Sequence, residues 1–243
     1  MRYKVIISYD GSSYSGFQVQ PNAYTIQSEI EKTLAQVLGV PVTLVASGRT
    51  DAGVSAIEQV CHFDVDNPLD TRRAIGYANS LLPRDIRIHQ IEEVSSDFHA
   101  RYSAVAKTYL YYFYCGRAEI PVLDKVAAFE QGSLDIDSMN SACQYFKGEH
   151  DFSAFCASGS QVESKVRTII DIRIDKIDNL FRLEITGNGF LYNMVRIIMG
   201  TLFDVGRGKI SPDSITDIIN SGDRARAGKT ASAKGLYLKK VLY

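Results

Sequence analysis

Cysteine is scarce in this chain of 243 residues and never occurs in a C-x-x-C pair, and histidine is equally scattered. The cysteines are Cys61, Cys115, Cys143 and Cys156, and the histidines are His62, His89, His99 and His150. Isolated thiols of this kind are typical of reduced, packed side chains rather than of a disulfide scaffold. Because no ligand spacing of a zinc or iron site is present, we expect no metal cofactor.

Long hydrophobic runs are also missing. The longest apolar stretch, from Val195 to Phe203, is interrupted by Arg196 and is far too short to span a bilayer. The opening residues, MRYKVIISYD, alternate between apolar and polar side chains and do not resemble a signal peptide. These features favour a cytoplasmic protein.

Neither sign of charge is in excess, since 27 basic and 28 acidic residues leave a formal net charge of −1. A basic excess is the usual footprint of nucleic-acid binding, but a local basic patch can supply phosphate contacts without it. Composition therefore does not identify a partner. The hydrophobic share of 45 % is that of a globular protein with one large domain or two small ones.

Apolar periodicity predicts the order βαββαβ twice along the chain. In the first half, strands are expected at 3–9, 42–46, 57–65 and 86–91, and helices at 26–38 (between Thr25 and Gly39) and 70–82. In the second half, strands are expected at 107–114, 166–177, 180–186 and 236–242, and helices at 135–146 and 190–205, with a short extra helix opened by Ser211 and Pro212.

This order predicts an α+β fold of two ferredoxin-like βαββαβ units with mainly antiparallel sheets, packed side by side with helices on one face. The expected domains are 1–100 and 101–243. A ligand cleft is expected where two such units meet.

One glycine-framed loop, ASGRTDAGVSA at 46–56, is the strongest candidate for chemistry. Arg49 and Asp51 stand between Gly48 and Gly53, which supply turn conformations. A polar loop between two strands is usually a solvated turn. The alternative is that Asp51 is a nucleophile or base, with Arg49 placed for an anionic substrate.

Other segments have both a structural and a functional interpretation. The tyrosines of KTYLYYFY, Tyr109 among them, either pack or direct one ring into a cleft to stack a base or move a proton. Arg196 lies in an apolar helix and needs a carboxylate or phosphate, in a structural pair or in a site. Tyr14 and Phe17, in YDGSSYSGFQVQ, mark a hairpin or an Ω-loop.

The segment GDRARAGKTAS resembles a phosphate-binding loop, but five residues rather than four separate Gly222 from Gly228. It also follows a helix instead of a strand. We therefore favour a basic surface loop.

Together these segments resemble the TruA-type tRNA pseudouridine synthases along nearly the whole chain. The motifs that carry the resemblance are YDGSSYSGFQVQ, SGRTDAGVSA, PRDIRI, DFHARYSAVAKTYLY, GEHDFSAF, VRTI, GNGFLYNMVRIIMG and ASAKGLYL. The resemblance implies an isomerase that converts uridine to pseudouridine at positions 38, 39 and 40 in the anticodon stem-loop of tRNA. It also implies a homodimer without cofactor or metal, and an RNA cleft between the two units.

The resemblance assigns roles to individual residues. Asp51 matches the catalytic aspartate, Tyr109 the active-site tyrosine and Arg196 the basic residue that pairs with the aspartate. Arg49 matches the loop arginine that helps to extrude the target base. The remaining expected RNA contacts are Phe17, Arg101 and Arg167.

The chain departs from the family pattern at Ser55, where a histidine is usual, and at Phe17, where a tryptophan is usual. Two rival functions remain open. A non-catalytic RNA-binding protein of the same fold would not require an Asp51–Arg196 pair. A metal-free hydrolase would normally need a second carboxylate at a set distance from Asp51, and none stands out in the loop.

Overall fold

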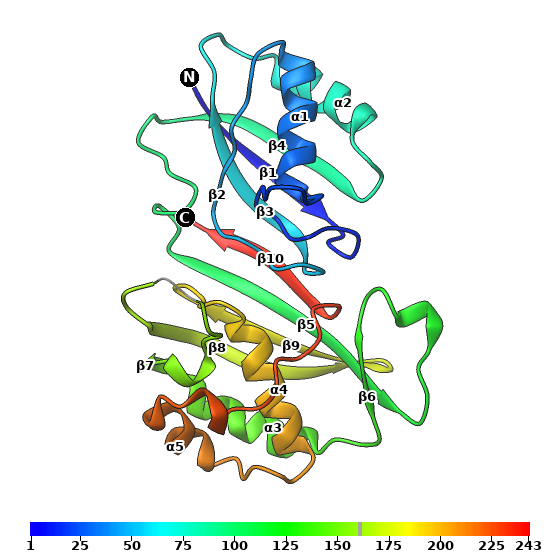
Figure 1. The fold of residues 1–243 in the computed structure, drawn as a ribbon, viewed down its shortest axis with the longest axis vertical. Helices are drawn as coiled ribbons and strands as arrows, with labels where there is room; N and C mark the ends of the chain where they lie inside the picture. Colours follow the sequence, from blue (N-terminus) through cyan, green and yellow to red (C-terminus); the bar gives the residue numbers. More distant parts are fainter. Residues whose placement is uncertain (160–161) are drawn as a thin grey trace. The chain divides into compact units, whose positions relative to one another are not determined.

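The structure, a computed structural model, describes residues 1–159 and 162–243 (Figure 1). Contacts between residues group the chain into a first unit, Met1–Val105 with Tyr237–Tyr243, and a second unit, Ala106–Leu236. The expected domains, 1–100 and 101–243, divide the chain differently at its last strand. The physical reason is that this strand pairs with a strand of the first unit.

The first unit contains the expected βαββαβ order and one added strand. Its elements are β1 (Arg2–Tyr9), α1 (Ile26–Leu38), β2 (Val45–Ala46), β3 (Ser55–Asp64), α2 (Thr71–Leu81), β4 (Ile86–Val94) and, from Tyr237 on, β10 (Leu236–Leu242). The strand order is β4-β1-β3-β10, with β2 paired to β3. All these pairs are antiparallel except β3 with β10, which is parallel.

Local chemistry explains where the first two helices begin and end. The Thr25 side chain accepts a hydrogen bond from the Ser28 amide at the start of α1, and Gly39 ends this helix with a φ of 72°. Asp70 accepts from the Arg73 amide at the start of α2. The buried side chains of β1 alternate as its sequence predicts, so one face of this strand is buried, and β1 pairs with both β3 and β4.

The strand expected at 42–46 is shorter, because side chains of α1 occupy part of its backbone. The Leu44 backbone amide donates to the Glu31 carboxylate at 2.7 Å, and the Leu44 carbonyl accepts from Nε2 of the Gln27 side chain at 3.1 Å. Only Val45 and Ala46 pair with β3. The loop that carries Asp51 therefore starts from a segment that is fixed to both α1 and β3.

The second unit is built on an antiparallel sheet with the strand order β5-β9-β8-β7, and β6 is parallel to β5. Its elements are β5 (Ala106–Gly116), β6 (Ala128–Gln131), α3 (Ile136–Cys143), β7 (Gly148–Asp151), β8 (Val166–Ile177), β9 (Leu180–Gly187), α4 (Met194–Gly206) and α5 (Ser214–Ser221). α4 is buried along most of its length and packs against α3. Its apolar sequence predicted this burial.

Several expected boundaries in the second unit are wrong. α4 begins at Met194 rather than at residue 190, because Asn193 has a φ of 59° and cannot continue a helix backwards. α5 begins at Ser214, because the Ser211 hydroxyl donates to the Asp213 carboxylate within a turn. The short strands β6 and β7 were not expected, since four partly exposed residues give no clear alternation.

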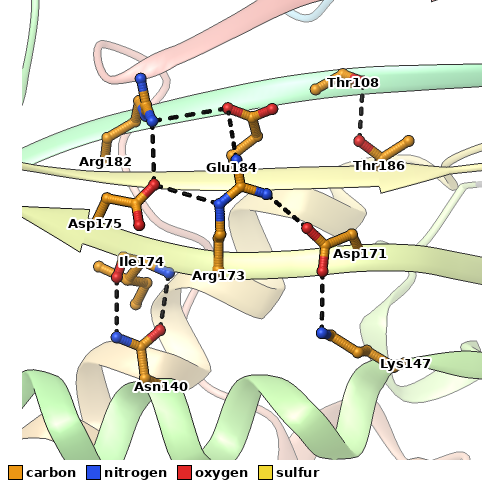
Figure 2. A network of polar contacts seen from close by, with 10 residues as sticks. All are labelled: Thr108, Asn140, Lys147, Asp171, Arg173, Ile174, Asp175, Arg182, Glu184 and Thr186. Carbon is orange, nitrogen blue, oxygen red and sulfur yellow. Dashed lines mark hydrogen bonds and ion pairs between the residues drawn. The ribbon is translucent and has the colours of Figure 1, made fainter.

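In each unit an asparagine on a helix binds backbone groups of a strand at a position with a neighbouring strand on one side only. The Asn79 side chain on α2 bonds both the carbonyl and the amide of Ile88 in β4, at 2.7 and 2.9 Å. Asn140 on α3 bonds Ile174 in β8 in the same way, at 2.9 and 2.8 Å (Figure 2). These backbone groups are therefore not offered to another strand.

An ion-pair network covers part of β8 and β9 (Figure 2). Its members are Lys147, Asp171, Arg173, Asp175, Arg182 and Glu184. The three cations face three carboxylates, so this surface offers no net charge to phosphates. Exposed pairs of this kind each contribute about 0–1 kcal/mol to stability.

Candidate active site

The loop at 46–56 connects β2 to β3 in the first unit. Its Arg49 side chain is exposed, Thr50 is buried and Asp51 is half-buried. The Val54 amide donates to the Asp51 carbonyl at 3.1 Å across a turn in which Gly53 has a φ of 78°. Gly53 thus supplies the left-handed conformation that was expected of it, because L side chains rarely adopt this φ.

Gly48 has a different role from the one expected, since its φ is not positive. Its carbonyl accepts from the Gln59 side chain at 2.9 Å, and Gln59 in turn accepts from the Ser47 hydroxyl at 2.6 Å. Ser47 and Gln59 are both buried. The base of the loop is therefore fixed to β3 by a buried polar pair.

The segment that follows β1, which includes the YDGSSYSGFQVQ motif, packs directly on the loop. The Phe17 amide donates to the Thr50 carbonyl at 3.0 Å, and the Gly11 amide donates to the Ser55 hydroxyl at 3.1 Å. A Cβ at Gly11 would lie 2.1 Å from the Val54 carbonyl oxygen. Two separate motifs of the sequence therefore form one structure around Asp51.

Phe17, which the motif resemblance predicts as an RNA contact, is buried beneath the loop, and its RNA contact stays a prediction. Its side chain is 1 % exposed and packs against Tyr9, with 5.9 Å between ring centroids. Packing in the core beneath the loop explains why an apolar ring, Phe17, stands where the family usually has tryptophan. The structure also gives Ser55 a role, since its buried hydroxyl accepts a hydrogen bond from the Gly11 amide.

Tyr109 lies on β5 in the second unit, opposite Ile185 of β9, and is 9 % exposed. Its ring meets Phe190 edge to face, with centroids 5.1 Å apart. A Cβ added at the neighbouring Gly189 would lie 3.4 Å from Nε of Arg167. The short segment between β9 and α4 thus brings Tyr109 and Arg167 into one neighbourhood.

Arg196 lies in the first turn of α4 and is half-buried. Its Nε donates to the Ala231 carbonyl and its Nη1 to the Asn193 side-chain oxygen, both at 2.8 Å. The Arg196 carbonyl accepts from the Ala231 amide at 3.0 Å. These acceptors are uncharged, so they orient the guanidinium without neutralising it.

Close backbone contact holds the GDRARAGKTAS segment against α4. A Cβ at Gly200 would lie 1.7 Å from the Lys229 carbonyl oxygen, and the Gly228 amide donates to the Thr201 hydroxyl at 2.9 Å. Within the same segment, Arg224 donates to the carbonyls of Ala227 and Gly228. This arginine braces its own loop.

The expected site residues therefore fall into two groups. Asp51, Arg49, Phe17 and Arg101 belong to the first unit, and Tyr109, Arg167 and Arg196 belong to the second. The pairing of Asp51 with Arg196 stays a prediction. Sequence reasoning missed Tyr9 and Asn193, which hold Thr50 and Arg196 respectively.

Among the described residues, no group of three or more histidine, cysteine, aspartate or glutamate side chains is placed to hold a metal ion. No helix among these residues has the length and apolar character needed to cross a bilayer. The four cysteines are free thiols, and Cys61, Cys143 and Cys156 are buried.

Comparison with known proteins gives the family. Residues 5–103 and 142–243 match the family model described as tRNA pseudouridine synthase, and the chain belongs to this family of isomerases. It is 46 % identical over 240 residues to a protein of Acetivibrio thermocellus named tRNA pseudouridine synthase A, covering 99 % of this chain and 98 % of that one. A protein of Ruminiclostridium cellulolyticum with the same name is 45 % identical over 243 residues, covering 100 % and 99 % of the two chains.

Proposed function

We propose that this enzyme converts uridine to pseudouridine at positions 38, 39 and 40 in the anticodon stem-loop of tRNA. The observation that carries the proposal is the loop at 46–56, which holds a half-buried Asp51 two residues from an exposed Arg49. The names of the relatives support a tRNA substrate. The positions within the tRNA follow from the motif resemblance.

The isomerisation of uridine to pseudouridine requires an ionised carboxylate. It neither adds nor removes atoms. The bond from uracil N1 to ribose C1′ breaks, a bond from C5 to C1′ forms, C5 loses a proton and N1 gains one. Attack at C1′, attack at C6 and deprotonation at C2′ are three possible first steps. Each of them uses one carboxylate on a rigid support, and this is the role proposed for Asp51.

A uridine within a stem must leave the base stack before a carboxylate can reach it. Arg49 is exposed and would hold the vacated space while it contacts a phosphate. Tyr109, whose ring is braced by Phe190, would stack on the extruded uracil and assist removal of the proton from C5. Arg196 would keep the Asp51 carboxylate ionised.

The proposal requires Asp51 of the first unit and Arg196 and Tyr109 of the second to act on one uridine. It extends to a homodimer in the cytoplasm that needs no cofactor. It also includes two ferredoxin-like units: the order β4-β1-β3 with β2 on β3 in the first unit supports this assignment.

The test is isomerisation of an unmodified tRNA that carries uridines at 38–40 with tritium at C5. Wild-type protein should release tritium, and Asp51→Asn should release none while it still binds the tRNA in a filter assay. Asp66→Asn, which changes an exposed carboxylate beyond β3, is the matched control and should keep full activity. Firm binding by the wild type without release would instead make the protein a non-catalytic RNA binder.

A further inference from the structure

A tight turn at 99–103 in the first unit is fixed by its own hydrogen bonds. The His99 amide donates to the Ser103 hydroxyl at 3.0 Å, and the Ser103 amide donates to the His99 carbonyl at 2.9 Å. Nδ1 of His99 accepts the amides of both Arg101 and Tyr102, at 3.1 and 3.2 Å. The positions of Arg101 and Tyr102 are thus set by the backbone.

The same turn is attached to the base of the loop that carries Asp51. The Ala100 amide donates to Nδ1 of His62 at 3.1 Å, and the Ala100 carbonyl accepts from the Tyr243 hydroxyl at 2.7 Å. His62 is paired with Val45, just before the loop begins. Tyr243 is also hydrogen-bonded to Ser47, within the loop itself.

On this fixed support, Tyr102 is 77 % exposed. The ring of His99 lies against it, with centroids 4.3 Å apart, and the Arg101 guanidinium lies 5.7 Å from its centroid. An aromatic ring that is rigid and exposed loses little conformational entropy when it binds a partner. The adjacent cation favours a partner that carries negative charge.

We propose that Tyr102 is a stacking platform for an unpaired base of the substrate RNA, and that Arg101 contacts an adjacent phosphate. Bases present a π-face to aromatic side chains, and phosphates pair with arginine, so RNA fits both neighbouring groups. The turn is attached near the end of β3, at His62, whereas Asp51 precedes the start of that strand, so the platform would bind a part of the RNA away from the target uridine. The inference rests on the proposed function in so far as it takes RNA as the substrate.

The first unit offers a matched control for this pair. Tyr77 on α2 is 51 % exposed and has the Arg73 guanidinium 5.3 Å from its ring centroid. Its helix packs against α1 and β4 and has no part in the turn at 99–103. A general effect of losing an exposed tyrosine beside an arginine would therefore appear equally in Tyr77→Ala.

The test measures the Kd of unmodified tRNA at fixed salt for wild type, Tyr102→Ala, Tyr102→Phe and Tyr77→Ala. Tyr102→Ala should weaken binding about tenfold, because the stacked ring is lost. Tyr102→Phe keeps the ring and should stay within about twofold of wild type, and Tyr77→Ala should bind as wild type does. Arg101→Gln should reduce the salt dependence by about one phosphate contact.

Unchanged binding by Tyr102→Ala would overturn the inference. So would a change in the sedimentation of the RNA-free Tyr102→Ala protein, because the ring would then contact a second copy of the chain. Tritium release by the wild type at saturating tRNA is measured in parallel. If the wild type releases none, the proposed function fails, whereas the platform is still decided by the Kd values alone.

Discussion

The hydroxyl of Tyr9, at the end of β1, lies 2.8 Å from the hydroxyl of Thr50, the residue before Asp51. Both side chains are buried, at 4 and 6 % exposure. The Thr50 carbonyl is bound separately by the Phe17 amide. Thr50 is therefore held through both its side chain and its backbone. Because Asp51 is the next residue, its backbone is fixed as well.

Tyr9→Phe should lower both stability and activity. The Thr50 hydroxyl would stay buried without this bond, which costs about 1–2 kcal/mol of unfolding free energy. The loop would lose one of its supports, so kcat for tritium release should fall more than Kd for tRNA rises. Urea denaturation and saturation kinetics measure the two effects.

The double variant Tyr9→Phe with Thr50→Val provides the control for stability. Removing both hydroxyls leaves neither polar group unsatisfied, so the double variant should be more stable than Tyr9→Phe alone. Its kcat should remain low, because the loop is still without that support. Full recovery of kcat in the double variant would show that the pair contributes only to stability.

Gly11→Ala should disrupt the loop that carries Asp51, although the substitution adds only one methyl group. The added Cβ would lie 2.1 Å from the Val54 carbonyl oxygen, so one of the two backbone segments must move. We expect loss of tritium release and a lower melting temperature. The matched control is Gly76→Ala, in the exposed face of α2, where a Cβ meets nothing within 4 Å.

Gly76→Ala should raise stability by about 0.5–1 kcal/mol, since alanine is the better helix former. Its activity should equal that of the wild type. Wild-type activity in Gly11→Ala would contradict the close packing of the two motifs. The comparison separates a general glycine effect from the specific approach of Gly11 to Val54.

The sequence was most informative where a local rule decides the structure. Thr25 and Gly39 predicted both ends of α1, and the apolar run before Val205 predicted a buried helix. The strand at 42–46 was too long in the prediction, because Gln27 and Glu31 compete for the Leu44 backbone. That competition joins residues distant in sequence and leaves no local pattern.

The candidate site shows the same limit. The GRTDAGV motif made Asp51 the catalytic candidate, but nothing local indicated that the Tyr9 hydroxyl would bond Thr50 or that Asn193 would orient Arg196. Phe17 was expected to contact RNA because of the motif resemblance. Its burial against Tyr9 depends on how the segment that follows β1 folds over the loop.

Stability should fall in mildly acidic solution because of His62. Burial, followed by the charges of Arg2 and His99, lowers the pKa of His62 below its ordinary value of 6.5, against a smaller opposite effect of Asp64. Protonation would also place a proton on Nδ1, which accepts the Ala100 amide. The unfolded state therefore binds the proton more readily, and stability is lost as pH falls below about 6.5 towards the lower folded pKa.

His62→Gln keeps an acceptor for the Ala100 amide but does not titrate. Urea denaturation from pH 7.5 to pH 5 should show a shallower loss of stability for this variant than for wild type. Asp64 acts in a separate window: Arg2 lowers its pKa, so its contribution is lost only as pH falls below about 4. Identical slopes for the two proteins between pH 6.5 and pH 5 would show that His62 does not cause the effect.

Arg196→Lys should impair catalysis although it keeps the positive charge. A lysine has one ammonium group on a flexible stem and cannot reproduce the fork that bonds Ala231 and Asn193. Under the proposed function Arg196 pairs with Asp51, so the charge would then be misplaced, and a misplacement of about 1 Å is enough to lower kcat about a hundredfold. The tRNA Kd should change much less, because the charge remains.

Single-turnover tritium release and filter binding measure kcat and Kd for this variant. Lys229→Arg, on the segment that packs against α4, is the control for a conservative change nearby. If Arg196→Lys keeps wild-type kcat, the charge alone suffices and the orienting contacts of Ala231 and Asn193 have no catalytic role.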